Sequence, residues 1–193
     1  KRELICGYGE ILKHSLIASN QNFVYLKKYK NEILKMKSPY TEKTIFESCK
    51  IKKNIVEKDE KEKNLRKTLN FGHTFAHSYE AALSYSSRLN HGEAVILGII
   101  SACEFSFQNK FLNKKDYNEI INHIKSLKLK LNINNLFSKR DINNLINFML
   151  MDKKNKSSKI NLILLKKIGS PIINLSFTKD KVKNILKKIL INN

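Results

Sequence analysis

Hydrophobic residues recur at helical spacing along most of the chain. The stretch "GEILKHSLI" places Ile11, Leu12 and Leu16 on one face, and "FVYLKKYKNEIL" predicts a second helix over residues 23–34. After "KSPYT", Thr41 is in position to cap a long helix that continues through "EKTIFESCKIKKNIVEK". With two prolines and six glycines in 193 residues, helix breakers are few, so we expect a mainly α chain.

The middle of the chain continues this pattern. The run from Leu65 to Leu83 has a helical period, and a loop, "SYSSRLN", follows it. The next stretch, "GEAVILGIISACEFSFQ", is strongly apolar and rich in small residues, which predicts a buried central helix. Two or three amphipathic helices are expected from Lys114 to about Leu150.

The pattern changes near the C-terminus. Two apolar runs flank Gly169, Ser170 and Pro171, which predicts a β-hairpin near residues 160–177. The last segment, "KDKVKNILKKILINN", has one apolar helical face, formed by Val182, Ile185, Leu186, Ile189 and Leu190. We find no internal repeat and no long linker, so residues 1–193 are predicted to form a single multi-helix domain with a small hairpin.

The net charge of +20 raises the question of an anionic partner. A basic helical nucleic-acid-binding protein would cluster its lysines on one face. Here the lysines are spread along the chain, and their excess over arginine, with heavy use of asparagine and isoleucine, is typical of drift in an AT-rich genome. Nucleic-acid binding is therefore the alternative of a different class, and we expect no nucleic-acid partner. No run of about 18 apolar residues predicts a membrane helix.

The cysteines indicate a compartment. Cys6, Cys49 and Cys103 have no CxxC spacing, which suits a reducing, cytoplasmic setting. Each is expected to be a small buried residue rather than a ligand.

One stretch, "RKTLNFGHTFAHSYE", carries candidate chemistry. His73 and His77 are four residues apart, and Arg66 and Asn70 precede them by seven, so a continuous helix would place all four on one side. Such a polar stripe is either a solvated face or the lining of a site. Histidine and arginine favour a site, because this chain uses lysine and glutamate on its other polar faces.

Further candidates lie on either side of this stretch. His91 stands where a loop meets a helix, and Glu10 and Lys13 are three apart on the first helix. Two histidines and a carboxylate can hold zinc with an open position for a substrate, where the ion acts as a Lewis acid. Arg66 and Lys13 would contact anionic groups. Spacing alone leaves open a capping or core role for His91, and the chain has no HExxH motif and no glycine-rich dinucleotide fingerprint.

Four blocks in a fixed order carry a family resemblance. They are "RELICGYGEILKHSLI", "CKIKKNIVEKDEKEKNLRKTLNFGHTFAHSYE", "LNHGEAVILGI" and "MLMDKKNKSSKINLILLKKIG". Together they resemble the C-terminal domain of the 3-dehydroquinate synthase family over essentially the whole chain. The resemblance implies a dehydroquinate synthase-like multi-helix domain.

The resemblance also implies roles for individual residues. Metal ligands, usually to zinc and sometimes to cobalt, would be Glu10, His73 and His91. Contacts to the hydroxyls, carboxylate and phosphate of the substrate would come from Lys13, Lys52, Arg66, Asn70, His77 and the Lys153–Lys154 pair. His77 is thereby assigned to the substrate rather than to the metal, and which lysine of the pair faces the substrate stays open.

The activity that the resemblance implies is the conversion of 3-deoxy-D-arabino-heptulosonate 7-phosphate, a phosphorylated sugar acid, to 3-dehydroquinate and phosphate in the shikimate pathway. That reaction uses bound NAD, and the full enzyme is expected to be a homodimer. The family's N-terminal α/β NAD-binding domain is absent from this chain, so we expect a fragment of a longer two-domain enzyme. The alternatives are another sugar-phosphate cyclase or a metal-dependent polyol dehydrogenase, and the D-K-K block with Arg66 and Asn70 disfavours the dehydrogenase.

Overall fold

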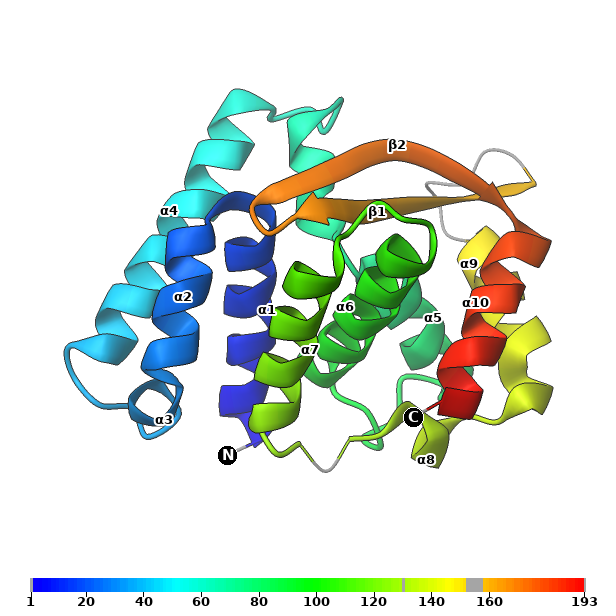
Figure 1. The fold of residues 1–193 in the computed structure, drawn as a ribbon, viewed down its shortest axis with the longest axis horizontal. Helices are drawn as coiled ribbons and strands as arrows, with labels where there is room; N and C mark the ends of the chain where they lie inside the picture. The colour runs from blue at the N-terminus through cyan, green and yellow to red at the C-terminus, as the bar shows by residue number, and fades with distance from the viewer. Residues whose placement is uncertain (1, 130, 152–157, 193) are drawn as a thin grey trace.

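The protein is mainly helical with one β-hairpin (Figure 1), in a computed structural model that describes residues 2–129, 131–151 and 158–192. The α-helices are α1 (Arg2–Ala18), α2 (Asn20–Lys28), α3 (Lys30–Ile33), α4 (Tyr40–Lys58), α5 (His73–Ala82), α6 (His91–Gln108), α7 (Lys114–Ser126), α8 (Ile133–Leu136), α9 (Ile142–Met151) and α10 (Lys179–Asn192). Two short 3₁₀ helices are η1 (Leu65–Asn70) and η2 (Lys139–Asp141), and the strands are β1 (Lys159–Lys167) and β2 (Ser170–Thr178). The predicted fold class is confirmed.

Helix α6 lies at the centre of the molecule. Thirteen of its 18 residues are buried, and it packs against α1, α5, α7 and α10. Its start is fixed by a capping box, in which the backbone N–H of Asn90 donates to Glu93 Oε2 over 2.9 Å. The predicted buried central helix is therefore confirmed, with His91 as its first residue.

The hairpin lies across one end of the helices (Figure 1). Its antiparallel register runs from Lys159 opposite Thr178 to Lys167 opposite Ser170. Gly169 makes the turn with φ +81°, and its N–H donates to the carbonyl of Leu16 over 2.8 Å, which ties the hairpin to α1. The predicted hairpin and the predicted apolar face of α10 are both confirmed, since four of the five face residues are buried and the fifth, Leu190, is partly buried.

Two details near the N-terminus differ from the predictions. The single helix expected over residues 23–34 is broken at Tyr29, where α2 ends and α3 begins. Thr41 is not the cap of α4, because Pro39 occupies that position and the helix starts at Tyr40. Thr41 already lies in the first turn, where its hydroxyl donates to the carbonyl of Lys37.

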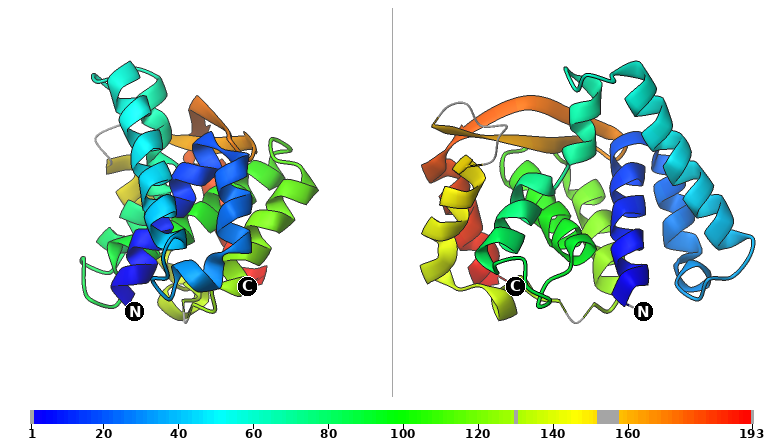
Figure 2. Two further views of the ribbon diagram at one scale, coloured as in Figure 1. Left: turned by 90° about the vertical axis from the view of Figure 1, so that its left-hand side faces the viewer. Right: turned by 180° about the vertical axis from the view of Figure 1, so that it is seen from behind.

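The continuous helix expected from Leu65 to Leu83 is also wrong. The chain forms η1, turns at Gly72 with φ +78°, and then begins α5. A Cβ at Gly72 would lie 2.9 Å from the backbone nitrogen of Ile99, so only glycine fits against α6 here. Arg66 and Asn70 therefore do not continue the helical stripe of His73 and His77. Figure 2 shows η1 beside α4, α1 and the hairpin.

The three cysteines differ in burial. Cys103 is buried, but Cys6 is only half-buried and Cys49 is exposed, so the expectation of three buried cysteines is wrong for two of them. Within the part of the chain that the structure describes, no helix combines the length and apolar character needed to cross a bilayer.

Candidate metal and substrate site

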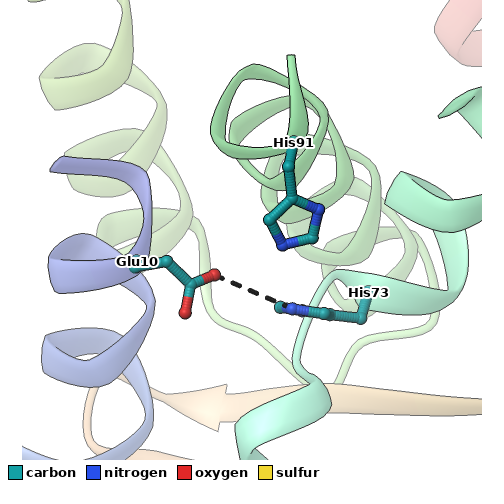
Figure 3. Close-up of side chains that lie close together, drawn as sticks. All are labelled: Glu10, His73 and His91. Atoms are coloured by element: carbon teal, nitrogen blue, oxygen red, sulfur yellow. Dashed lines mark ion pairs between the residues drawn. The ribbon is translucent and has the colours of Figure 1, made fainter. Parts of the chain in front are cut away.

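Glu10, His73 and His91 converge from three helices. Glu10 lies in the middle of α1, and His73 and His91 are the first residues of α5 and α6. One ligand atom from each side chain lies within 4.8 Å of the others. Figure 3 shows the three side chains pointing toward one another, with Glu10 Oε1 3.7 Å from His73 Nε2.

Close backbone packing beside each of these residues brings them together. A Cβ at Gly92 would lie 2.2 Å from Cys6 Cα, and one at Gly9 would lie 2.7 Å from the carbonyl oxygen of Gly92. A Cβ at Gly98 would lie 2.2 Å from the carbonyl oxygen of Gly72. Three of these glycines are direct neighbours in sequence of a cluster residue. Helices α1, α5 and α6 therefore come into backbone contact right beside the cluster.

An ion pair between Arg2 and Glu93 also holds α1 and α6 together near the cluster. The guanidinium of Arg2 donates from Nε to Glu93 Oε1 over 2.7 Å and from Nη2 to Oε2 over 2.6 Å. Such a two-point contact has a defined geometry. It joins the start of α1 to the start of α6, two residues after His91.

Hydrogen bonds set the tautomers of both histidines. His91 Nδ1 lies 3.0 Å from a carboxylate oxygen of Glu80, and His73 Nδ1 lies 3.3 Å from the carbonyl oxygen of Phe71. Both oxygens can only accept, so each Nδ1 carries the proton and each Nε2 keeps its lone pair. A carboxylate or carbonyl behind a histidine in this way is the usual support of a metal ligand.

Glu10 has one oxygen in use and one without a partner. Its Oε2 accepts a hydrogen bond of 2.7 Å from Lys13 Nζ. Its Oε1 is buried and has no hydrogen-bond partner among the described residues. A buried carboxylate oxygen left unpaired is costly, and a cation between Glu10, His73 and His91 would satisfy it. The donor set of two nitrogens and one carboxylate oxygen fits zinc, which binds such atoms at about 2.0–2.2 Å.

Electrostatics favour the metal-binding protonation states of Glu10 and His73. Burial, and then the charge of Lys13, lower the pKa of His73 to about 3, so its ring is neutral. Burial raises the pKa of Glu10, but the charge and hydrogen bond of Lys13 outweigh burial and leave that pKa below its ordinary value. The hydrogen bond to Glu80 raises the pKa of His91, so at this residue a metal ion competes with a proton. An ionised carboxylate and neutral imidazoles are the metal-binding forms.

A cavity of about 260 Å³ opens beside the cluster. It is lined by Glu10, Lys13, His14, Lys52, Glu62, Arg66, Leu69, Asn70 and His73. Three of these side chains are cations, namely Lys13, Lys52 and Arg66, which suits an anionic ligand. The structure thus gathers most of the predicted site residues, although by the packing of η1 against α1 and α4 rather than by one helix.

The remaining predicted residues have different outcomes. His77 is exposed, and its ring centre lies 5.3 Å from that of His73 and 6.3 Å from that of His91, beside the cluster but outside the set that lines the cavity. The Lys153–Lys154 pair lies outside the described residues, so its position is not tested.

A compact loop presents Arg66 to the cavity. The carboxylate of Asp59 accepts hydrogen bonds from the backbone N–H groups of Lys63, Asn64 and Arg66, at 2.9, 2.7 and 3.0 Å. These bonds lower the pKa of Asp59, with the bond from Arg66 contributing most. Asp59 thereby fixes the start of η1.

Sequence reasoning missed the partners that orient the candidates. Glu62 accepts a hydrogen bond of 2.7 Å from the amide of Asn70, and Glu80 supports His91. His14, which also lines the cavity, was not singled out. A signal existed for Glu80, since it lies seven residues after His73, on the same face of α5.

The fold and this site define a class: a helical domain in which a histidine–carboxylate cluster adjoins a cationic cavity. Residues 7–155 match the family described as "3-dehydroquinate synthase C-terminal", and the chain belongs to that family.

Relatives agree over nearly the whole chain. The 3-dehydroquinate synthase of Pelagibacter ubique (strain HTCC1062) is 53% identical over 190 residues, which cover 98% of this chain and 52% of that protein. The 3-dehydroquinate synthase of Thermoanaerobacter sp. (strain X514) is 36% identical over 187 residues, covering 97% and 51%. The chain therefore spans about half the length of the curated relatives it matches.

Solved structures share the fold. A 2-epi-5-epi-valiolone synthase from Streptomyces hygroscopicus subsp. jinggangensis 5008, with NAD+ and Zn2+ bound, superposes with a TM-score of 0.84 at 19% identity, covering all of this chain and 52% of that one. A 2-deoxy-scyllo-inosose synthase complexed with carbaglucose-6-phosphate, NAD+ and Co2+ gives 0.79 at 22% identity, covering 97% and 52%. At these identities the likeness establishes the fold alone.

Proposed function

We propose that this chain supplies the metal and substrate site of a 3-dehydroquinate synthase, which converts 3-deoxy-D-arabino-heptulosonate 7-phosphate to 3-dehydroquinate and phosphate. The observation that carries the proposal is the convergence of Glu10, His73 and His91 at the edge of a cavity lined by three cations. A metal ligand set and an anion-binding wall at one place suit a phosphorylated sugar acid.

In this proposal Glu10, His73 and His91 hold Zn2+ or Co2+. An ion bound there would supply Lewis-acid chemistry to the substrate. Lys13, Lys52 and Arg66 bind the carboxylate and the phosphate. Because these charges are fixed before the substrate arrives, they orient it without further reorganisation.

Further residues complete the proposed substrate contacts. The amide of Asn70, oriented by Glu62, is placed to hydrogen-bond a substrate hydroxyl. His77, whose ring centre lies 5.3 Å from that of His73, is assigned to the substrate rather than to the ion through the family motif. The Lys153–Lys154 pair belongs to the proposal through the family motif alone.

The rest of the enzyme is also proposed. We expect NAD to be bound mainly by an α/β domain outside this chain, and the full enzyme to be a cytoplasmic homodimer. The alternative of another sugar-phosphate cyclase draws on the shared fold of such enzymes. The sequence relatives favour dehydroquinate synthase, since those with 36–53% identity carry that name.

The proposal is tested by metal content and phosphate release. The purified chain would be assayed by elemental analysis, then supplied with NAD, the heptulosonate substrate and a separately expressed NAD-binding domain from a relative. We expect about one metal ion per chain, as for a single site of this donor set, and phosphate release only with the added domain. A chain that binds no metal, or that releases no phosphate from the substrate when NAD and the added domain are both present, would contradict the proposal.

A further inference from the structure

His14 is a buried group of the cavity that the proposed reaction does not yet use. It lies one helical turn after Glu10 on α1, so the two residues share a face of the helix. The residue is only 5% exposed, yet it lines the same cavity as the three cations. A buried side chain that also lines a binding cavity is a candidate for contact with the ligand.

The two ring nitrogens of His14 differ sharply. Nδ1 lies 2.7 Å from Ser48 Oγ, a hydroxyl supplied by α4. Nε2 is buried and has no hydrogen-bond partner among the described residues. Buried polar atoms are almost always paired, and one left unpaired beside a binding cavity indicates a partner that arrives with the ligand. The bond to Ser48 holds the ring in place.

The charge state of His14 indicates which chemical group of a ligand can pair with its ring. Burial, followed by the positive charge of Lys13, lowers its pKa to about 4, so the ring is neutral. The anionic groups of a ligand are drawn to Lys13, Lys52 and Arg66 in the same cavity. A neutral imidazole nitrogen suits a hydroxyl, which can donate or accept and thus satisfies either tautomer.

We propose that His14 is a substrate-binding residue whose Nε2 forms a hydrogen bond with a hydroxyl of the sugar acid, and that Ser48 is the positioning residue that orients the ring. This inference rests on the proposed function, because it takes the phosphorylated sugar acid as the ligand of the cavity. It adds a specificity contact from α1 that distinguishes a hydroxylated ligand from a deoxygenated one.

The test is binding to the full zinc-loaded chain, which needs no catalysis. Isothermal titration calorimetry with 3-deoxy-D-arabino-heptulosonate 7-phosphate would compare the wild type with His14→Asn, which keeps a polar atom near Ser48 and deletes Nε2. We expect about 10-fold weaker binding, the loss of one neutral hydrogen bond. His14→Gln, whose amide reaches further, should recover part of the affinity, and Ser48→Ala should show a smaller loss. The control is Thr44→Val, one turn before Ser48 on α4, which should bind as the wild type does.

Deoxygenated analogues separate a direct contact from a structural effect. One analogue lacking a single hydroxyl should bind the wild type about 10-fold more weakly while binding His14→Asn no worse than the parent compound does. Zinc content and melting temperature are measured for each variant, and a loss of affinity that tracks either of them would overturn the contact. Equal affinities of wild type and His14→Asn would overturn this inference alone. A wild-type chain that does not bind the sugar acid would overturn the proposed function as well.

Discussion

At the residue scale, the support behind each histidine matters as much as the histidine itself. Glu80 is buried, and its carboxylate holds the Nδ1 proton of His91, which leaves Nε2 directed toward Glu10 and His73. Without that carboxylate the ring could rotate or change tautomer. The metal site therefore includes a residue that does not touch the ion.

Replacing Glu80 tests this support. We expect Glu80→Ala to weaken zinc binding by about 10- to 100-fold, because His91 loses the group that fixes its tautomer. The measurement is a titration against a chromophoric chelator. Glu57→Ala, at an exposed pair with Lys53, is the matched control and should leave zinc binding as it was. An unchanged zinc affinity in Glu80→Ala would show that His91 does not bind the ion through Nε2.

A buried histidine that is not part of the cluster predicts a pH dependence of folding. His123 Nε2 lies 2.9 Å from the Tyr8 hydroxyl, and burial, then Lys30 and Lys27, lower the pKa of His123 to about 4. The unfolded chain binds this proton at about pH 6.5, so stability is lost as pH falls from 6.5 toward 4, by about 3 kcal/mol for this group.

The variant His123→Gln checks that dependence. It keeps a hydrogen-bonding group for Tyr8 but removes the titration, so the stability gap between wild type and variant should narrow by about 2–3 kcal/mol between pH 7 and 4.5. Urea unfolding of the metal-free chain at several pH values measures it. A gap that stays constant with pH would mean that His123 is protonated inside the fold.

The limits of sequence reasoning at this scale have a physical cause. Glu10, His73 and His91 could be predicted because each stands in a recognisable block. The roles of His14 and Glu80 could not, because their partners are brought to them by folding. Ser48 is 34 residues from His14, and no local spacing encodes that contact.

At the element scale, the site depends on helices that approach to backbone contact. Gly98 in α6 faces the carbonyl of Gly72, one residue before His73. Hydrophobic periodicity predicted a continuous helix over Leu65–Leu83, because periodicity depends only on local sequence and carries no information about the packing of α6 against this segment. The left-handed turn at Gly72 and the 3₁₀ geometry of η1 are set by that neighbour.

Alanine substitutions compare a packed glycine with an open one. In Gly98→Ala the new Cβ would lie 2.2 Å from a backbone oxygen that cannot rotate away, so we expect a loss of about 3 kcal/mol in the free energy of unfolding. In Gly7→Ala on α1 the Cβ meets nothing within 4 Å, so stability should rise by up to about 1 kcal/mol. Denaturant unfolding gives both values. Similar effects of the two substitutions would refute the close approach of α5 and α6.

At the scale of the whole molecule, the fold class could be predicted from the sequence, but the role of the net charge could not. The mainly α class and the C-terminal hairpin could be predicted, since both follow from periodicity and breakers that are local in sequence. The net charge of +20 does not by itself identify a binding partner. In the proposed function, the charges that bind the ligand are the three cations that line one cavity.

The dependence on salt concentration distinguishes DNA binding by the scattered lysines from zinc binding at the cluster. We expect any binding of duplex DNA by the scattered lysines to fall steeply with ionic strength, since it depends on counterion release. Zinc retention should hold across the same range, because coordination bonds are not screened in this way. Fluorescence anisotropy with labelled DNA and elemental analysis at each salt concentration measure the two. Tight DNA binding that persists at physiological salt would support the nucleic-acid alternative.

The most direct measurement is zinc content in three single variants, Glu10→Ala, His73→Ala and His77→Ala, beside the wild type. We predict that the wild type and His77→Ala each retain about one zinc per chain, while the other two lose it, because only Glu10 and His73 belong to the ligand set with His91. Equal zinc loss in all three variants, or retention by His73→Ala, would contradict the assignment of metal to one histidine of the pair and substrate to the other.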